Sequence, residues 1–278
     1  MDEKNEIYEN INNNIENSKE NKNTNEFKIN QKESFYNNPE LHKYNLSIAP
    51  MLEITTKHYM HFMRFLTKQT LIYSEMINTN EILHKENSLD FSQDLEPICI
   101  QFGGSDPESF GLAAQKAKNK GFKELNINCG CPSKKVSAGN FGAVLMKDPD
   151  LVGKCVKKMN EQIFSSIKCR LGLDKFDQKF LENFIEKTKN ISGCSKYILH
   201  ARIAIMGIDT MKNRTVPSLQ YSVVEEMKNK YPDLNIVING GIKDFNIVKE
   251  FNEKNIGVMI GREAYDNPWK FRNADSEI

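Results

Sequence analysis

The stretch Glu124-Leu125-Asn126-Ile127-Asn128-Cys129-Gly130-Cys131-Pro132-Ser133 alternates polar and apolar residues and then ends in a turn. Alternation with period two predicts a strand, with the apolar side chains and Cys129 on one face and the two asparagines on the other. The Gly-Cys-Pro turn then displays Cys131 at the strand end, where a thiol can act as a proton donor or a nucleophile. An ordinary buried cysteine beside a tight turn is the alternative, because free cysteine is often buried.

Similar short apolar runs recur from residue 46 onward. The eight predicted strands are Leu46–Leu52, Thr70–Met76, Pro97–Gly103, Glu124–Gly130, Ser166–Gly172, Lys196–Arg202, Asn235–Gly241 and Gly257–Glu263. Segments with helical spacing lie between them, among them Pro107–Lys120, Pro149–Phe164, Phe176–Thr188 and Leu219–Tyr231. This alternation predicts parallel strands with right-handed crossovers, and eight units match an α/β TIM (β/α)8 barrel. A doubly wound open sheet is disfavoured because no Gly-x-Gly-x-x-Gly follows an early strand.

The chain divides by composition. Residues 1–42 are rich in Asn, Lys and Glu, and such a segment buries too little apolar surface to fold, so we expect a disordered extension. Residues 43–278 form the predicted barrel domain. The disordered extension is either a functional tail or a product of compositional bias, and bias is the simpler explanation.

Composition also restricts the class of protein. The sequence contains no apolar run of membrane-spanning length, no signal core and no acidic-poor transit peptide, so we expect a cytoplasmic protein. The 6 cysteines are scattered and the 5 histidines form no zinc pattern, so neither disulfides nor a metal site is expected. A net charge of +1 gives only a weak signal for nucleic-acid binding.

Polar residues follow the predicted strands at the end where a barrel enzyme carries its active site. They include Gln101, Asn128, Lys168, His200 and Arg202. A lysine pointing into a barrel needs an anionic partner, and a reduced flavin offers one, although a lone strand lysine is more often solvent-facing. A glutamine presents both a donor and an acceptor, as the edge of a flavin ring requires. A lone histidine at a strand end is more often structural than catalytic.

The last two strands end in glycine, which lets backbone N–H groups approach an anion. The sequences are Asn239-Gly240-Gly241 and Gly261-Arg262, and loops after strands 7 and 8 of TIM barrels commonly bind phosphate. Tight strand-to-helix turns would also explain these glycines. Pro50-Met51-Leu52 could pack on a flat cofactor ring, or Met51 could be an ordinary core methionine.

Taken together, the motifs resemble those of the tRNA-dihydrouridine synthases, most closely the branch that modifies D-loop uridine 20/20a. The resemblance covers about Leu46 to Trp269. It rests on Ala49-Pro50-Met51-Leu52, Tyr73-Ser74-Glu75-Met76, Gln101-Phe102-Gly103-Gly104-Ser105-Asp106-Pro107, Asn126 to Ser133, Gly139-Asn140-Phe141-Gly142-Ala143, His200-Ala201-Arg202, Ile238-Asn239-Gly240-Gly241-Ile242, Val258-Met259-Ile260-Gly261-Arg262 and Tyr265-Asp266-Asn267-Pro268. Collinear motifs over such a length are far more specific than any one of them.

The resemblance implies an FMN-dependent barrel that reduces the C5–C6 bond of a D-loop uridine in tRNA, with NADPH as electron donor. Flavin N5 would give hydride to C6, and Cys131 would protonate C5 as general acid. Asn128 would help to hold flavin and uracil, and Arg202 would contact the substrate. The implied FMN contacts are Pro50, Met51, Leu52, Gln101, Lys168, His200, Asn239, Gly240, Gly241, Gly261 and Arg262.

Two details of this assignment follow from residue chemistry. A free cysteine thiol has a pKa of about 8.5 and is mostly protonated at neutral pH, as a general acid must be. Cys129, on the apolar face, is expected to pack behind the strand. The loop after the catalytic strand could bring Lys134 and Lys135 to tRNA phosphates, although a loop charge pair is often only solvated. We expect a monomer.

The sequence departs from the family pattern at two places. The family continues past the barrel into a small helical domain, whereas this sequence stops at Ile278; the expectation is that this domain is missing. After Arg202 the family favours a lysine and an aromatic residue, and here the sequence is Ile203-Ala204-Ile205-Met206-Gly207. Two other functions therefore stay open: an FMN-dependent TIM-barrel reductase of a free pyrimidine or an enone, and a truncated, non-catalytic RNA-binding barrel.

Overall fold

The eight strands of the chain close into a parallel barrel in which neighbours in sequence are neighbours in space. The structure, a computed structural model, describes residues 45–277; the extension expected at residues 1–42 lies outside the described residues. The strands are β1 (Leu46–Ile48), β2 (Leu71–Asn78), β3 (Ile98–Gly103), β4 (Glu124–Cys129), β5 (Phe164–Arg170), β6 (Lys196–His200), β7 (Asn235–Asn239) and β8 (Gly257–Ile260). β1 pairs with β8 and completes the ring. The predicted TIM barrel is confirmed.

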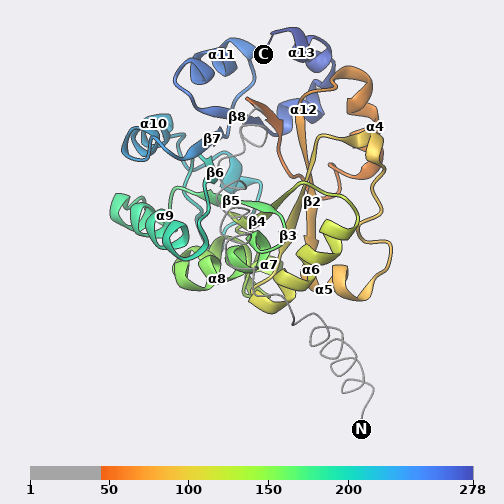
Figure 1. Cartoon of the computed structure of the whole chain (residues 1–278). Coiled ribbons are helices and arrows are strands. Elements are labelled where there is room, and N and C mark those ends of the chain that lie inside the picture. Colours follow the sequence, from red (N-terminus) through yellow and green to blue (C-terminus); the bar gives the residue numbers. More distant parts are fainter. Residues whose placement is uncertain (1–44, 278) are drawn as a thin grey trace, which may run out of the picture. The chain divides into compact units, whose positions relative to one another are not determined.

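Helices follow the strands around the barrel in chain order (Figure 1). The helices are α4 (Lys57–Leu66), α5 (Thr79–His84), α6 (Pro107–Asn119), α7 (Lys134–Ala138), α8 (Pro149–Asn160), α9 (Gln178–Ser192), α10 (Tyr221–Lys230), α11 (Phe245–Glu253), α12 (Arg262–Asp266) and α13 (Ala274–Glu277), with 3-10 turns η1 (Gln93–Leu95), η2 (Gly142–Lys147), η3 (Lys212–Arg214) and η4 (Pro268–Asn273). Side-chain caps fix several starts: Asp106 accepts the N–H of Ser109, and Asp148 accepts that of Leu151. Both are followed by proline, whose fixed φ suits the first helical position.

Two apolar layers hold the barrel together. The larger layer lies between strands and helices and includes Leu125, Ile127 and Cys129 of β4, all fully buried. A smaller cluster contains Ala49, Leu71, Tyr73, Cys99, Ile198, Val237 and Met259. Because successive strand residues point to opposite faces, the packing of Cys129 with the outer layer places Asn126 and Asn128 inside the barrel. The expected position of Cys129 behind the strand is confirmed.

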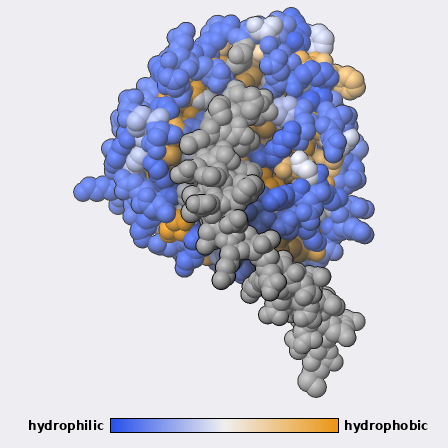
Figure 2. All heavy atoms as spheres, viewed as in Figure 1, coloured by the Kyte–Doolittle hydropathy of each residue, from blue (hydrophilic) through white to orange (hydrophobic). Residues whose placement is uncertain are grey.

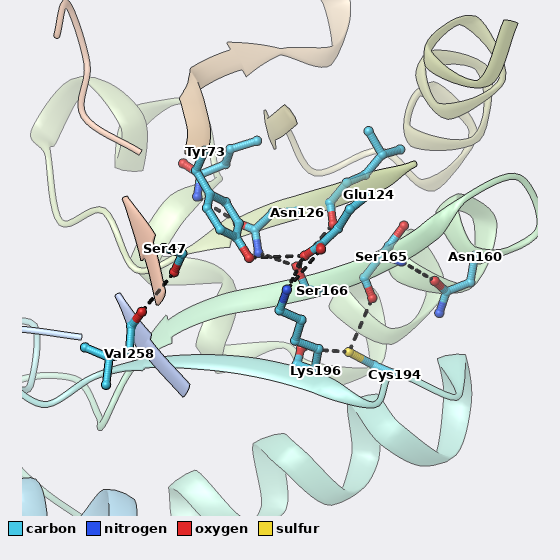
Figure 3. Close-up of polar contacts among 12 residues, drawn as sticks. Ser47, Tyr73, Glu124, Asn126, Asn160, Ser165, Ser166, Cys194, Lys196 and Val258 are labelled. Carbon is cyan, nitrogen blue, oxygen red and sulfur yellow. Dashed lines mark hydrogen bonds and ion pairs between the residues drawn. The ribbon is translucent and has the colours of Figure 1, made fainter. Parts of the chain in front are cut away.

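A charged pair is buried where β4 and β6 begin. Lys196 Nζ donates to both carboxylate oxygens of Glu124 at 2.8 and 2.9 Å, and both side chains are almost wholly inaccessible. Tyr73 Oη donates to the same carboxylate at 3.1 Å, and burial raises the pKa of Tyr73 well above its usual value. Figure 3 shows these three groups converging from different strands. The pair is neutral as a unit, and its hydrogen bonds offset the cost of burying two charges.

Several predicted strands extended too far at their C-terminal ends. Residues 49–52 form the loop after β1, and Glu263 belongs to α12, not to the last strand. Phe164 starts β5, although it was predicted to end a helix. After β1 the apolar run continues beyond the last paired residue, Ile48, because Ala49 is still buried in the inner apolar cluster.

The surface of the described chain is mostly hydrophilic on the face shown in Figure 2, with hydrophobic side chains in separate small areas. Among residues 45–277, no helix has the length and apolar character needed to cross a membrane. The same residues contain no group of three or more His, Cys, Asp or Glu side chains that could hold a metal ion.

Candidate active site

The polar residues predicted at the strand ends meet at the C-terminal mouth of the barrel. In the strand register Asn128 of β4 lies beside Lys168 of β5, and His200 of β6 lies beside Asn239 of β7. Gln101 of β3 joins this set through its side chain, whose Oε1 accepts the Nδ2–H of Asn128 at 2.9 Å. The structure therefore brings together five of the predicted site residues on five consecutive strands.

The turn that carries Cys131 is held from both sides. Asn128 Oδ1 accepts the backbone N–H groups of Gly130 and Cys131, each at 3.0 Å. The carbonyl of Cys131 accepts the N–H of Ala143 at 2.8 Å. Gly142, with φ of +76°, passes so close that an added Cβ would lie 2.6 Å from the Cys131 carbonyl oxygen. The position of the Cys131 backbone is thus defined by its neighbours.

The two thiols of this segment lie in different environments. Cys131 is partly exposed at the mouth, whereas Cys129 is fully buried in the outer apolar layer. Burial, together with nearby buried cysteines, raises the pKa of Cys129 well above its usual value. Of these two thiols, only Cys131 can meet a ligand in the barrel mouth.

Several cationic side chains gather at the mouth of the barrel. Burial lowers the pKa of Lys168 from 10.5 to about 8, and Arg170 and Arg214 contribute to the shift. Burial also lowers the pKa of His200 well below 6.5, helped by the nearby cations, so its imidazole is neutral at neutral pH. Among residues 45–277, no ion pair involves Lys168, Arg170, Arg202, Arg214 or Arg262. Such an arrangement is complementary to an anionic ligand.

Arg170, which the sequence interpretation left without a role, links the Cys131 turn to the loop after β6. Its Nε donates to the Gly130 carbonyl at 3.2 Å, and its Nη1 donates to the carbonyls of Ile203 and Asn213 at 2.9 and 3.0 Å. Burial lowers the pKa of Arg170 to about 10, which keeps it charged at neutral pH. The signal in the sequence was its spacing of two residues from Lys168, which puts both side chains on one face of β5.

Replacing Arg170 by lysine should therefore destabilise the barrel mouth. A lysine keeps the charge but cannot reach these three carbonyls at once, and loss of the buried bonds should cost about 3 kcal/mol. The expected result is a fall on the order of 10 °C in the thermal unfolding midpoint. The exposed Arg272, replaced in the same way, serves as control and should leave the midpoint unchanged. Equal midpoints for the two variants would contradict the role of Arg170.

The predicted phosphate loops lie after β7 and β8. Gly240 and Gly241 have φ of +117° and +70°, and a Cβ on Gly240 would lie 2.7 Å from Cδ2 of His200. Gly261 directly precedes α12, and Arg262 is exposed, with Nη2 donating to the Arg214 carbonyl at 3.3 Å. The Asn239 side chain binds the neighbouring strand β8, because its Nδ2 donates to the Met259 carbonyl at 2.8 Å.

The three predicted cofactor contacts in the loop after β1 differ in burial. Pro50 and Met51 are partly buried, and the Met51 backbone is held by Thr55 Oγ1 through bonds of 2.9 and 3.1 Å. Met51 packs against the outer core at its edge. Leu52 is 64% exposed, so it lies on the surface of the described chain.

The predicted substrate residues differ in exposure. Lys134 and Lys135 are exposed in the short helix α7, directly after the Cys131 turn. Arg202 is mostly buried, and its Nη1 donates to the carbonyls of Thr215 and Pro217. Its Nε is buried and has no hydrogen-bond partner within residues 45–277. Arg202 therefore holds the loop after β6 through its Nη1 group, and its buried Nε–H could donate to a ligand.

Comparison with known proteins agrees with this geometry. The family described as "Dihydrouridine synthase (Dus)" matches residues 47–278. The tRNA-dihydrouridine(20/20a) synthase of Vibrio vulnificus is 40% identical over 85% of this chain and 74% of its own length. The enzymes of that name from Synechocystis and Salmonella typhi are 41% and 42% identical, each over 84% of this chain and over 71% and 72% of their own lengths.

A solved structure supports the fold alone. The complex of 2-naphthoyl-CoA reductase with 2-naphthoyl-CoA superimposes with a TM-score of 0.62 at 9% identity, over 84% of this chain and 50% of that one. The extent of the family match and the identity to its curated members lead to one conclusion. This chain belongs to the dihydrouridine synthase family, whose members are FMN-dependent reductases of uridine in tRNA.

Proposed function

We propose that this protein reduces the C5–C6 bond of a D-loop uridine of the 20/20a type in tRNA, with FMN as cofactor and NADPH as electron donor. The observation that carries the proposal is the polar mouth of the barrel, where a partly exposed cysteine lies beside a cluster of cations that have no carboxylate partner in the described part of the chain. We further expect the protein to act as a monomer in the cytoplasm.

The residues at the mouth fit FMN. Gly240, Gly241 and Gly261 carry no side chain that would keep a phosphate from their backbone N–H groups, and Arg262 would supply charge beside it. Lys168, unpaired among the described residues, complements the negative charge of a reduced flavin ring. Bound FMN would supply hydride to the uracil.

The protein's own contribution would be to hold the base and to deliver a proton. Cys131 would give its thiol proton to C5, because it is the exposed thiol at the mouth and its backbone is fixed by Asn128 and Ala143. Asn128 keeps one N–H that its bond to Gln101 does not use, and this donor would face a carbonyl of the base. A base inside folded tRNA must leave its stack to reach these groups.

The exposed pair Lys134 and Lys135 should contribute to tRNA affinity through phosphate contacts. A double alanine variant is expected to bind tRNA more weakly and to reduce the slope of log affinity against log salt by about 1.5. Alanines at Lys118 and Lys120, exposed at the C-terminal end of α6 and hence at the opposite end of the barrel, form the matched control. An unchanged salt slope for the Lys134/Lys135 variant would remove the pair from the interface.

One experiment separates the proposal from its two rivals. The purified protein with FMN should oxidise NADPH when unmodified tRNA is present, and not with free uracil or orotate. Oxidation coupled to the free pyrimidines instead would favour a small-molecule reductase. Failure to bind FMN would favour a non-catalytic barrel.

A further inference from the structure

A continuous row of hydrogen bonds runs through the barrel from the mouth to the buried ion pair. Asn128 Nδ2 donates to Gln101 Oε1 at 2.9 Å, and Gln101 Nε2 donates to Asn126 Oδ1 at 2.8 Å. Asn126 Nδ2 then donates to Ser166 Oγ at 3.0 Å. Ser166 in turn lies 3.2 Å from Glu124 Oε1 and 3.1 Å from the Leu125 carbonyl.

The partners at the two ends of this row both require that the hydrogen bonds be donated in one direction, from Asn128 toward Ser166. At the mouth, Asn128 Oδ1 must accept, because its partners are backbone N–H groups. At the other end, the Ser166 hydroxyl faces a carboxylate and a carbonyl, which only accept, so its oxygen must receive the N–H of Asn126. Each amide in between therefore has one orientation that satisfies all partners, and reversing any one of them would place two donors face to face.

The Glu124 carboxylate that fixes the lower end is itself held by three donors. Lys196, Tyr73 and Ser166 surround its Oε1, and Figure 3 shows the Asn126 side chain beside this cluster, next to Tyr73. Asn126 is fully buried. Its side chain, through Ser166, connects the ion pair to the side chain of Gln101, which is also almost wholly buried.

We propose that Asn126 is a positioning residue that locks the Gln101 amide for the ligand in the barrel mouth. In this orientation Gln101 keeps one N–H and one lone pair beyond its bonds to Asn126 and Asn128. This inference rests on the proposed function for the identity of the ligand, FMN. Without the Asn126 oxygen, Gln101 Nε2 loses its hydrogen bond and the amide can rotate. FMN binding would then have to fix the orientation of the amide, which is already fixed in the wild-type protein.

Three variants distinguish positioning from stability. Asn126→Leu has a similar shape and cannot accept a hydrogen bond from Gln101. Asn126→Asp presents an oxygen to Gln101 in either protonation state, but it places a second acid beside Glu124. Asn160→Leu is the matched control, because Asn160 also bridges two partners, the Ser165 N–H and the Ser192 carbonyl, but outside the barrel interior (Figure 3).

The measurements are the FMN dissociation constant, the visible spectrum of bound flavin and the thermal unfolding midpoint. Asn126→Leu should weaken FMN binding about tenfold and alter the flavin spectrum. Asn126→Asp should have the lower midpoint of the two Asn126 variants yet bind FMN close to wild type. Asn160→Leu should lower the midpoint and leave FMN binding unchanged.

Two results would overturn the inference: wild-type FMN affinity in Asn126→Leu, or FMN affinity that simply follows the unfolding midpoint across the three variants. Because none of these measurements uses tRNA, they stay decisive even when the holoenzyme fails to reduce uridine. A wild-type protein that binds no FMN would reject both this inference and the cofactor.

Discussion

Replacement of Cys131 by alanine is expected to slow uridine reduction by about 10²–10⁴-fold, the usual contribution of a positioned acid. Cys131 is the partly exposed thiol at the mouth, and its turn is fixed by Asn128, Arg170 and Gly142. The measurement is a single turnover of pre-reduced FMN-loaded enzyme with unmodified tRNA.

Cys129→Ala is the matched control for this experiment. Cys129 is two residues away on the same strand, but its side chain packs in the outer layer with its pKa raised by burial. We expect a modest loss of stability, about 1 kcal/mol, and a turnover rate near that of wild type. Normal turnover in Cys131→Ala together with an inactive Cys129→Ala would refute the assignment of the acid.

Replacement of Lys168 by methionine should have two opposite effects. Burial lowers the pKa of Lys168 to about 8, so the folded protein without ligand holds this charge at a cost. Methionine should therefore stabilise the ligand-free protein, by on the order of 2 kcal/mol after allowance for solvent at the barrel mouth. The same change should weaken FMN binding by a factor of about ten or more, since an anion loses its partner.

The pH dependence of the wild-type protein follows from the same pKa. Between pH 8 and 10.5 the unfolded chain holds the Lys168 proton and the folded chain does not, so the free energy of unfolding should rise with pH across this window. FMN affinity should fall as pH rises through 8, because the cation is lost. Denaturant unfolding and FMN titration at several pH values test both trends, and the methionine variant should lack both. A variant with wild-type pH trends would show that another group is responsible.

The barrel itself could be read from the sequence because every strand repeats one pattern. Short apolar runs end in glycine or polar residues, and helices of sufficient length fill the gaps, as in Glu124–Cys129 followed by the Cys131 turn. Strand ends were less predictable. The apolar run at residues 46–52 gives no sign that β1 stops at Ile48, because Ala49 and Met51 still pack against the core in the loop that follows.

In the candidate site, too, some residues could be predicted from the sequence and others could not. The sequence predicted Lys168, Gln101 and Asn128, because each is a polar residue within or at the end of an apolar strand. Once the strand direction is known, such a residue is expected at the active-site end of the barrel. Glu124 and Lys196 were missed as a pair, although Glu124 shares the period-two face of Asn126 and Asn128. They begin two strands that are far apart in sequence, and only closure of the barrel brings them together. The commitment of the Arg202 and Asn239 side chains to backbone carbonyls was equally invisible, because it depends on loop geometry.

The most direct test of the proposed function is a map of dihydrouridine in tRNA from cells that lack this protein. The account predicts that D-loop dihydrouridine of the 20/20a type is lost in these cells. The modification should return with the wild-type protein and stay absent with Cys131→Ala. Unchanged dihydrouridine at these positions in the deleted cells would contradict it.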